Sequence, residues 1–241
     1  MGLCACGAPV EEAERFPHVP RTRASENQVL RFDGQDDYAS TGTAEFPHAR
    51  EPHTWSLWVN VRSLEGRQAL VTMRRDRDAG TQLALDDERV TAFRIYDGSV
   101  YVRAAEPLAA NTWTHVAYSF NGTTHTLYVN GERVAENELE PNNRTPTSCW
   151  LGSFDGYTDF LSGSLDDVRL DFGARSAEEL AREAAGEPPE ADSVDGNTRI
   201  VAFWRFDEAS GPLAFDDSSN HNDATLGDGI PENMPHRENS R

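Results

Sequence analysis

The chain has 241 residues, a formal charge of −19 and 37% hydrophobic residues, enough for one large all-β domain with tails or two small domains. So acidic a chain is repelled by nucleic acid and by anionic membrane surfaces, and no apolar run is long enough to span a bilayer. All 22 basic residues are arginine, which excludes a Schiff-base lysine, a P-loop lysine and a lysine general base.

Residues 1–27 are predicted to form an N-terminal arm, because residues 9–27 are polar and show little periodicity. The segment Leu3-Cys4-Ala5-Cys6 resembles the end of a bacterial lipoprotein signal, where cleavage precedes a cysteine that becomes lipid-modified. The charged and apolar regions that normally precede such a site are missing. Either the start is truncated and Cys6 is a lipidation site, or the match is accidental.

Short alternating segments separated by turn signals begin at Val29. The segment HTWSLWVNV (53–61) alternates between two faces of a strand, so Trp55, Leu57, Val59 and Val61 are expected to share one face. Residues 81–105 are expected to break into three strands, at Asp86-Asp87 and at Asp97-Gly98.

Two Asn-Gly pairs, Asn121-Gly122 and Asn130-Gly131, follow with alternating residues around them. A type I′ hairpin turn needs positive φ at both central positions, which Asn tolerates and Gly adopts freely. The pattern therefore predicts three consecutive antiparallel strands, at about 113–120, 123–129 and 132–138.

The second half of the chain adds two strands, a helix and a late strand. Ser176 and Glu179 have the spacing of a capping box, which predicts a helix at about 177–185. The composition from 227 to 241 is that of a disordered tail. The remaining predicted strands are CWLGSF (149–154), LSGSLDDVRLDF (161–172) and a late strand at 199–208.

Seven motifs in order resemble the LamG-like (laminin G-like) jelly-roll domains of the concanavalin A-like lectin/glucanase superfamily. They are VLRFDGQDDY, HTWSLWV, NTWTHVAYSF, LYVNGERV, LGS, GSLDDVRL and ARSAEEL. The resemblance covers about residues 28–185. It implies an all-β fold, a two-layer antiparallel β-sandwich or jelly roll, with one short helix.

One motif of such domains stands in an unusual place. They often open with W-x-F-D-E and then a D-x-S-G-N loop, whereas here Trp204-Arg-Phe-Asp207-Glu208 and Asp217-Ser-Ser-Asn220 come late. The late copy either completes the first sandwich, giving one domain over 28–226, or begins a second domain that is cut short. Completion is favoured, because a lone strand and loop cannot bury their apolar residues.

The resemblance also implies calcium, which domains of this kind often hold near loops rich in carboxylates. Asp33 and Asp166 are the first candidates, with Asp36 and Asp37 beside the former; Asp217, Asn220 and Asp223 form a second oxygen-rich loop. The alternative is structural: Asp33-Gly34 is turn chemistry and Asp166 caps backbone amides.

Aromatic rings in loops are candidates for binding sugars, which stack on rings through their apolar faces. The candidates are Tyr96, Tyr101, Phe154, Tyr157 and Phe160, with 154–160 as the best loop. The alternative is that these rings pack under loops. The glucanase strand E-x-D-x-x-E or E-x-D-x-E is absent from the sequence, so an enzyme is not expected.

These observations predict a non-catalytic recognition module that binds a glycan or a protein surface, with calcium as a cofactor. It is expected outside the cytoplasm, either secreted or lipid-anchored to a bacterial outer membrane, and without nucleic acid as a partner. The alternatives are a structural or adhesive surface domain with no small ligand and, less favoured, a glycan-cleaving enzyme.

Overall fold

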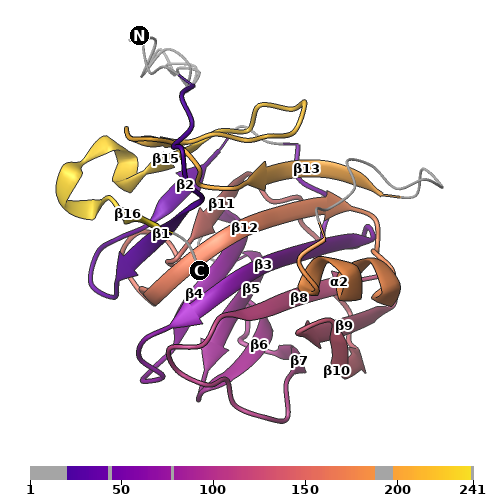
Figure 1. Cartoon of the computed structure of the whole chain (residues 1–241). Coiled ribbons are helices and arrows are strands. Elements are labelled where there is room, and N and C mark those ends of the chain that lie inside the picture. The colour runs from indigo at the N-terminus through magenta and orange to yellow at the C-terminus, as the bar shows by residue number, and fades with distance from the viewer. Residues whose placement is uncertain (1–20, 43–44, 77–78, 188–197, 240–241) are drawn as a thin grey trace, which may run out of the picture.

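The computed structural model describes residues 21–42, 45–76, 79–187 and 198–239. These residues form two antiparallel sheets packed face to face, with one α-helix on the outside (Figure 1). The predicted two-layer β-sandwich with one short helix is confirmed. None of the described helices has the length and apolar composition of a membrane span.

The first sheet has eight strands in the order β10-β9-β8-β3-β12-β1-β16, with β13 paired to β12. Their bounds are β1 Gln28–Asp33, β3 His53–Val61, β8 Thr114–Phe120, β9 Thr124–Val129, β10 Glu132–Glu138, β12 Ser162–Phe172, β13 Arg199–Trp204 and β16 His236–Asn239.

The second sheet has eight strands in the order β14-β15-β2-β11-β4-β5-β6-β7. Their bounds are β2 Ala39–Thr41, β4 Gln68–Asp76, β5 Ala79–Asp86, β6 Arg89–Arg94, β7 Val100–Arg103, β11 Ser148–Leu151, β14 Leu213–Ala214 and β15 Ala224–Leu226.

One hydrophobic core fills the space between the sheets. The alternating apolar residues of β3 are buried in it, as predicted, together with those of β8 such as Val116 and Tyr118. From the second sheet, Val71 and Leu83 face the same core. Cys149 on β11 is buried there too, and burial raises the pKa of its thiol, so the thiol stays protonated and unreactive at neutral pH.

The two Asn-Gly pairs form different turns. Asn130 and Gly131 both have positive φ, 50° and 79°, between the paired residues Val129 and Glu132, which fits the predicted turn. At the other hairpin the amide of Asn121 donates to the carbonyl of Thr124, so Gly122 and Thr123 form the tip. The type I′ prediction is wrong there, because the Asn121 side chain accepts from the amides of Thr123 and Thr124 instead.

Helix α2 (Ala177–Ala184) covers the outer face of the first sheet, as Figure 1 shows. The Ser176 capping box is present as predicted. Leu180 packs on Ala117 and Tyr128, and Glu183 accepts a hydrogen bond from Ser56 on β3. This cover explains why β8 is buried on both faces.

The late strand lies in the same sheet as β1. Strand β12 pairs with β1 along Ser162–Leu165 and with β13 along Val168–Phe172, so two segments from opposite ends of the chain share one strand position. A bulge between the two stretches places Asp167 at a φ of 47°. Such a bulge lets one strand serve two partners in succession.

The disordered tail predicted for 227–241 is wrong for its described part. Strand β16 pairs with β1 over Gln28–Arg31, and two 3₁₀ turns, η1 (Gly227–Gly229) and η2 (Pro231–Asn233), connect it to β15. The described end of the arm is also ordered, because the amide of Ala24 donates to the carbonyl of Asp207. Cys6 and the rest of the arm before residue 21 lie outside the described residues.

Candidate functional site

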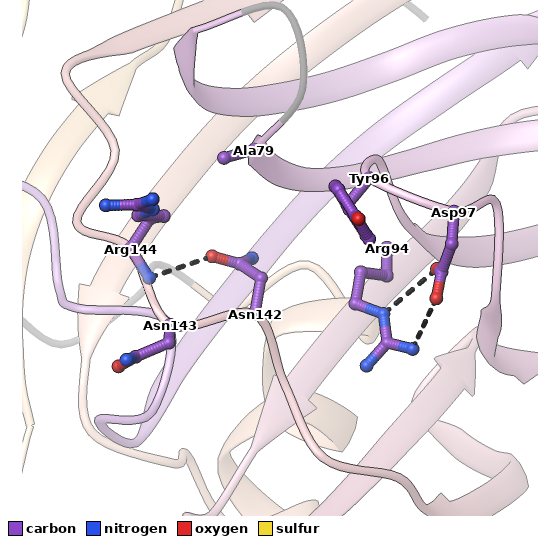
Figure 2. A pocket seen from close by; sticks show the side chains of 7 residues that line it. All are labelled: Ala79, Arg94, Tyr96, Asp97, Asn142, Asn143 and Arg144. Atoms are coloured by element: carbon purple, nitrogen blue, oxygen red, sulfur yellow. Dashed lines mark hydrogen bonds and ion pairs between the residues drawn. The ribbon is translucent and has the colours of Figure 1, made fainter.

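A pocket of about 490 Å³ opens beside the end of β6. Figure 2 shows Arg94, Tyr96 and Asp97 on one side of it, and the loop that carries Asn142 and Arg144 on the other. We call it the Tyr96 pocket; its lining is Ala79, Arg94, Tyr96, Asp97, Asn142, Asn143 and Arg144.

A tight turn after β6 presents the Tyr96 ring. The amide of Gly98 donates to the carbonyl of Arg94 at 3.0 Å, and that of Arg94 to the carbonyl of Ser99 at 2.8 Å. Gly98 takes a φ of 70°, which glycine adopts without strain. The turn leaves the Tyr96 side chain 74% exposed at the pocket.

Arg94 and Asp97 fix each other beside that ring. Nε of Arg94 donates to Oδ1 of Asp97 at 3.0 Å and Nη2 donates to Oδ2 at 2.6 Å. This two-point contact, with the amide of Ser99, lowers the pKa of Asp97, so its carboxylate is ionised at neutral pH. Nη1 of Arg94 also donates to the carbonyl of Glu140 at 2.8 Å, which ties the turn to the opposite loop.

The opposite loop is held from beneath by a buried tyrosine. The amide of Asn142 donates to the hydroxyl of Tyr101 at 2.9 Å, and the Asn142 side chain accepts from the amide of Arg144 at 3.1 Å. The carbonyl of Arg144 accepts from the amide of Ala49 at 3.1 Å. The backbone of the loop is therefore fixed, while the side chains of Asn143 and Arg144 are exposed.

The sequence had indicated only part of this pocket. Tyr96 was a candidate and lines it, whereas Tyr101 is fully buried and stacks on His125, so it supports the loop and is no binding surface. Arg94, Asp97 and Arg144 were missed. The turn signal at Asp97-Gly98 and the Pro and Asn residues within 140–147 were the available signals, and neither shows that the two segments meet.

The loop 154–160 lies elsewhere, across strands of the second sheet. Phe154 lies under the guanidinium of Arg74, 5.0 Å from ring centroid to Cζ, and is half-buried. Phe160 is half-buried as well, while Tyr157 is 80% exposed. These three rings do not line the Tyr96 pocket, so the structure does not bring the candidate rings together.

A family comparison bears on what such a pocket is for. Residues 33–181, more than half of the chain, match the family model of the concanavalin A-like lectin/glucanases superfamily. The chain belongs to this superfamily. The resemblance inferred from the seven motifs is thereby confirmed. A search of curated proteins finds no match.

Solved structures of this superfamily's fold resemble the chain at low sequence identity. One is a Bacteroides ovatus protein thought to bind carbohydrate: TM-score 0.65 and 16% identity, covering 90% of this chain and 60% of that one. Another is the heptameric SAP-like pentraxin of Limulus polyphemus: TM-score 0.56 and 13% identity, covering 76% of this chain and 93% of that one.

A third is domain 4 of AbnA, a GH43 extracellular arabinanase from Geobacillus stearothermophilus, in complex with arabinotriose. Its TM-score is 0.55 and its identity 17%, covering 65% of this chain and 76% of that one. Of these three, the Bacteroides protein is matched over 60% of its own length, so this chain spans less than two thirds of it. At these identities the likeness establishes a shared fold.

Asp33 and Asp166, the first candidates for calcium ligands, lie apart in the structure. Asp33 pairs with Ser162 in the register of β1 and β12, so Asp166 lies four residues further along β12, about 13 Å away. Asp166 is fully buried and accepts from the side chain of Asn27 at 3.4 Å. Asp33 and Asp166 therefore do not converge on one site.

Asp33 instead lies with its sequence neighbours. Carboxylate oxygens of Asp33, Asp36 and Asp37 all lie within 4.8 Å of one another. Burial, together with the two neighbouring carboxylates, raises the pKa of Asp37 to about 6, although the hydrogen bond from the amide of Asp33 opposes this. Hard oxygen donors at this spacing suit calcium, and a bound cation would relieve the repulsion.

The second oxygen-rich loop has its polar groups engaged within the protein. Asp217 forms an ion pair with Arg23, and Asp223 pairs with Arg21 at 2.6 Å. The amide group of Asn220 donates to the carbonyls of Ile200 and Val201, at 2.8 and 3.0 Å. Asp217 and Asn220 therefore fasten β13 and the arm, and they do not converge on a common point.

Proposed function

We propose that this chain is a non-catalytic carbohydrate-binding module whose binding site is the Tyr96 pocket. One observation carries the proposal: an exposed aromatic ring stands at an open pocket lined by a carboxylate, two guanidiniums and two amides. A sugar ring offers an apolar face for stacking and hydroxyls that both donate and accept hydrogen bonds. The pocket offers the complement to each.

The relatives support this choice of ligand class. Of the structures with the same fold, one is thought to bind carbohydrate and another was solved with arabinotriose. A protein surface is the second ligand class consistent with the fold. The glycan is favoured because the polar groups converge on a concave site, which suits a small polar ligand better than a broad contact.

The pocket supports binding better than cleavage. Glycoside hydrolysis needs two carboxylates that flank the scissile bond. The described lining of the Tyr96 pocket has a single carboxylate, Asp97, and Arg94 holds it in a two-point contact. That carboxylate is suited to accepting hydrogen bonds from hydroxyls.

A glycan array tests the proposal with two matched variants. Tyr96→Ala is expected to remove binding, while Tyr157→Ala keeps it, because Tyr157 is equally exposed but stands outside the pocket. Unfolding curves of both variants check that the fold is intact. Wild-type protein that binds no glycan, or glycan binding that survives Tyr96→Ala, would contradict the assignment.

We also propose that Asp33, Asp36 and Asp37 hold a calcium ion. The support is the spacing of their oxygens, with the burial and the neighbouring carboxylates that raise the pKa of Asp37. Calcium is expected to raise the unfolding temperature at pH 7, and Asp36→Asn is expected to weaken this effect. Sodium chloride at matched ionic strength is the control, and an equal rise with it would show mere screening.

Recognition of glycans outside the cytoplasm is the setting we propose for this module. Fractionation of cells that produce the full-length chain tests it directly. Recovery from the envelope or the medium is expected, and exclusive recovery from the cytosol would contradict it.

A further inference from the structure

We propose that the Tyr96 pocket selects acidic sugars, with Arg144 as the residue that recognises their carboxylate or sulfate group. The inference rests on the proposed function and narrows its ligand class. It comes from the charge balance of the pocket's described lining, which is opposite in sign to that of the protein.

The described lining of the pocket carries a surplus positive charge. Arg94 and Asp97 neutralise each other through two hydrogen bonds, of 3.0 and 2.6 Å. Arg144 remains, and within the described part of the chain its exposed guanidinium has no carboxylate partner. The chain as a whole has a charge of −19, so one uncompensated cation at a pocket is a specific local feature.

The neighbouring hollow has the opposite balance. It measures about 400 Å³, and its lining residues are Arg50, Gly122, Thr123, Glu138, Leu139, Glu140 and Pro141. Two carboxylates there face one arginine, and Glu140 already pairs with Arg50 at 3.5 Å. An anion is therefore disfavoured on that side of the loop and favoured at Arg144.

The backbone of Arg144 is prepared for this role. Its amide donates to Asn142 and its carbonyl accepts from Ala49, both at 3.1 Å, so the side chain leaves from a fixed point. A guanidinium presents a planar pair of donors that matches the two oxygens of a carboxylate or sulfate. Tyr96 across the pocket offers its ring to the apolar face of the same sugar.

Three trisaccharide probes test the charge requirement. They are an oligogalacturonate, its methyl ester, and a sulfated galactan that lacks carboxylates. We expect the wild type to bind the first or the third at least fivefold more tightly than the ester. Arg144→Gln is expected to abolish that preference, while Arg144→Lys keeps part of it. Arg133→Gln, which removes an exposed arginine on β10, is expected to keep it.

Each outcome decides the inference. Preference for the uronate alone assigns a carboxylate, and preference for the sulfated probe alone assigns a sulfate. Equal binding of the acid and its ester, or a preference unchanged by Arg144→Gln, overturns the inference. In that case binding of neutral glycans that Tyr96→Ala abolishes still upholds the proposed function, whereas binding of no glycan at all defeats both.

Discussion

Tyr96 and Tyr157 are the two most exposed aromatic side chains of the described residues, at 74% and 80%. Tyr96 stands beside a pocket whose polar groups come from two segments far apart in the chain. Tyr157 stands on a loop whose polar groups bond to one another. Ser153 alone accepts from the amides of Asp155 and Gly156, at 3.3 and 2.9 Å, and donates to the carbonyl of Thr158 at 3.0 Å.

The comparison shows why exposure of an aromatic ring is a poor guide by itself. In the loop 154–160, polar groups form hydrogen bonds that hold the loop against the second sheet. Asp159, for example, accepts a hydrogen bond from the side chain of Gln82 at 3.1 Å. Around Tyr96, the side chains of Asn143 and Arg144 are exposed. This difference supports a structural role for the loop 154–160 and favours the Tyr96 pocket as the proposed binding site.

The largest expected effect concerns the loop 154–160. Gly152 lies two residues before it at a φ of 74°, and an added Cβ would approach the ring of Phe32 to 2.4 Å. Gly152→Ala should therefore reduce the free energy of unfolding by about 3 kcal/mol, from left-handed backbone strain and overlap together. Urea unfolding measures it.

Gly66→Ala is the matched control for that substitution. Gly66 has a similar φ of 70°, but nothing lies within 4 Å of its added Cβ. The cost there should be the backbone strain alone, about 1 kcal/mol. Equal losses in the two variants would show that the loop is not packed against Phe32.

A pH titration distinguishes the stability of the fold from glycan binding at the Tyr96 pocket. His53 on β3 is buried, and desolvation lowers the pKa of its imidazole to about 4, from an ordinary value of 6.5. Between these values the unfolded chain binds a proton that the folded chain does not, so stability falls as pH falls from 6.5 to 4. The loss is on the order of 3 kcal/mol for this group.

Binding should not follow that slope. The arginines of the Tyr96 pocket stay charged, and Arg94 holds the pKa of Asp97 well below its usual range. Affinity for a bound glycan is therefore expected to be flat from pH 8 to 5 while stability declines. His53→Gln should flatten the stability slope; an unchanged slope in that variant would remove His53 as its cause.

The pocket itself gives the next effect in size. Tyr96→Ala is expected to weaken binding of an array-identified glycan by about 2 kcal/mol, roughly 30-fold in Kd, because the stacking surface is lost. Tyr96→Phe keeps the ring and should stay within about threefold. Titration calorimetry measures both. A Tyr157→Ala variant that loses as much as Tyr96→Ala would erase the distinction between the two loops.

Local patterns sufficed to predict most strands of the sandwich, because alternation and turn residues act over a few neighbours. The Asp97-Gly98 turn and the Ser176 capping box are of this kind. The meeting of Arg94 with the carbonyl of Glu140 is different, since 46 residues separate them and only the folded sheets bring them together. No pattern within either segment encodes that contact.

The separation of Asp33 from Asp166 and the presence of strand β16 could not be predicted because both depend on how the strands pair. That β1 and β12 belong to one sandwich was foreseeable, but the offset that separates Asp33 from Asp166 depends on which residues pair. Strand β16 was missed because His236–Asn239 has no apolar residue to alternate. Its order comes from backbone pairing with β1, which composition does not reveal.

The smallest expected effect tests whether the Tyr101 hydroxyl supports the loop that carries Arg144. Tyr101→Phe removes the hydroxyl that accepts from the amide of Asn142 at 2.9 Å, and leaves the buried ring and its stacking on His125 in place. The loss of one buried hydrogen bond should cost about 1 kcal/mol of stability and weaken glycan binding roughly threefold, because the loop bearing Arg144 loosens. Tyr128→Phe is the control, since Tyr128 packs beneath α2 with Ala117 and Leu180. A Tyr101→Phe variant that loses stability but binds as tightly as the wild type would show that the loop needs no such support.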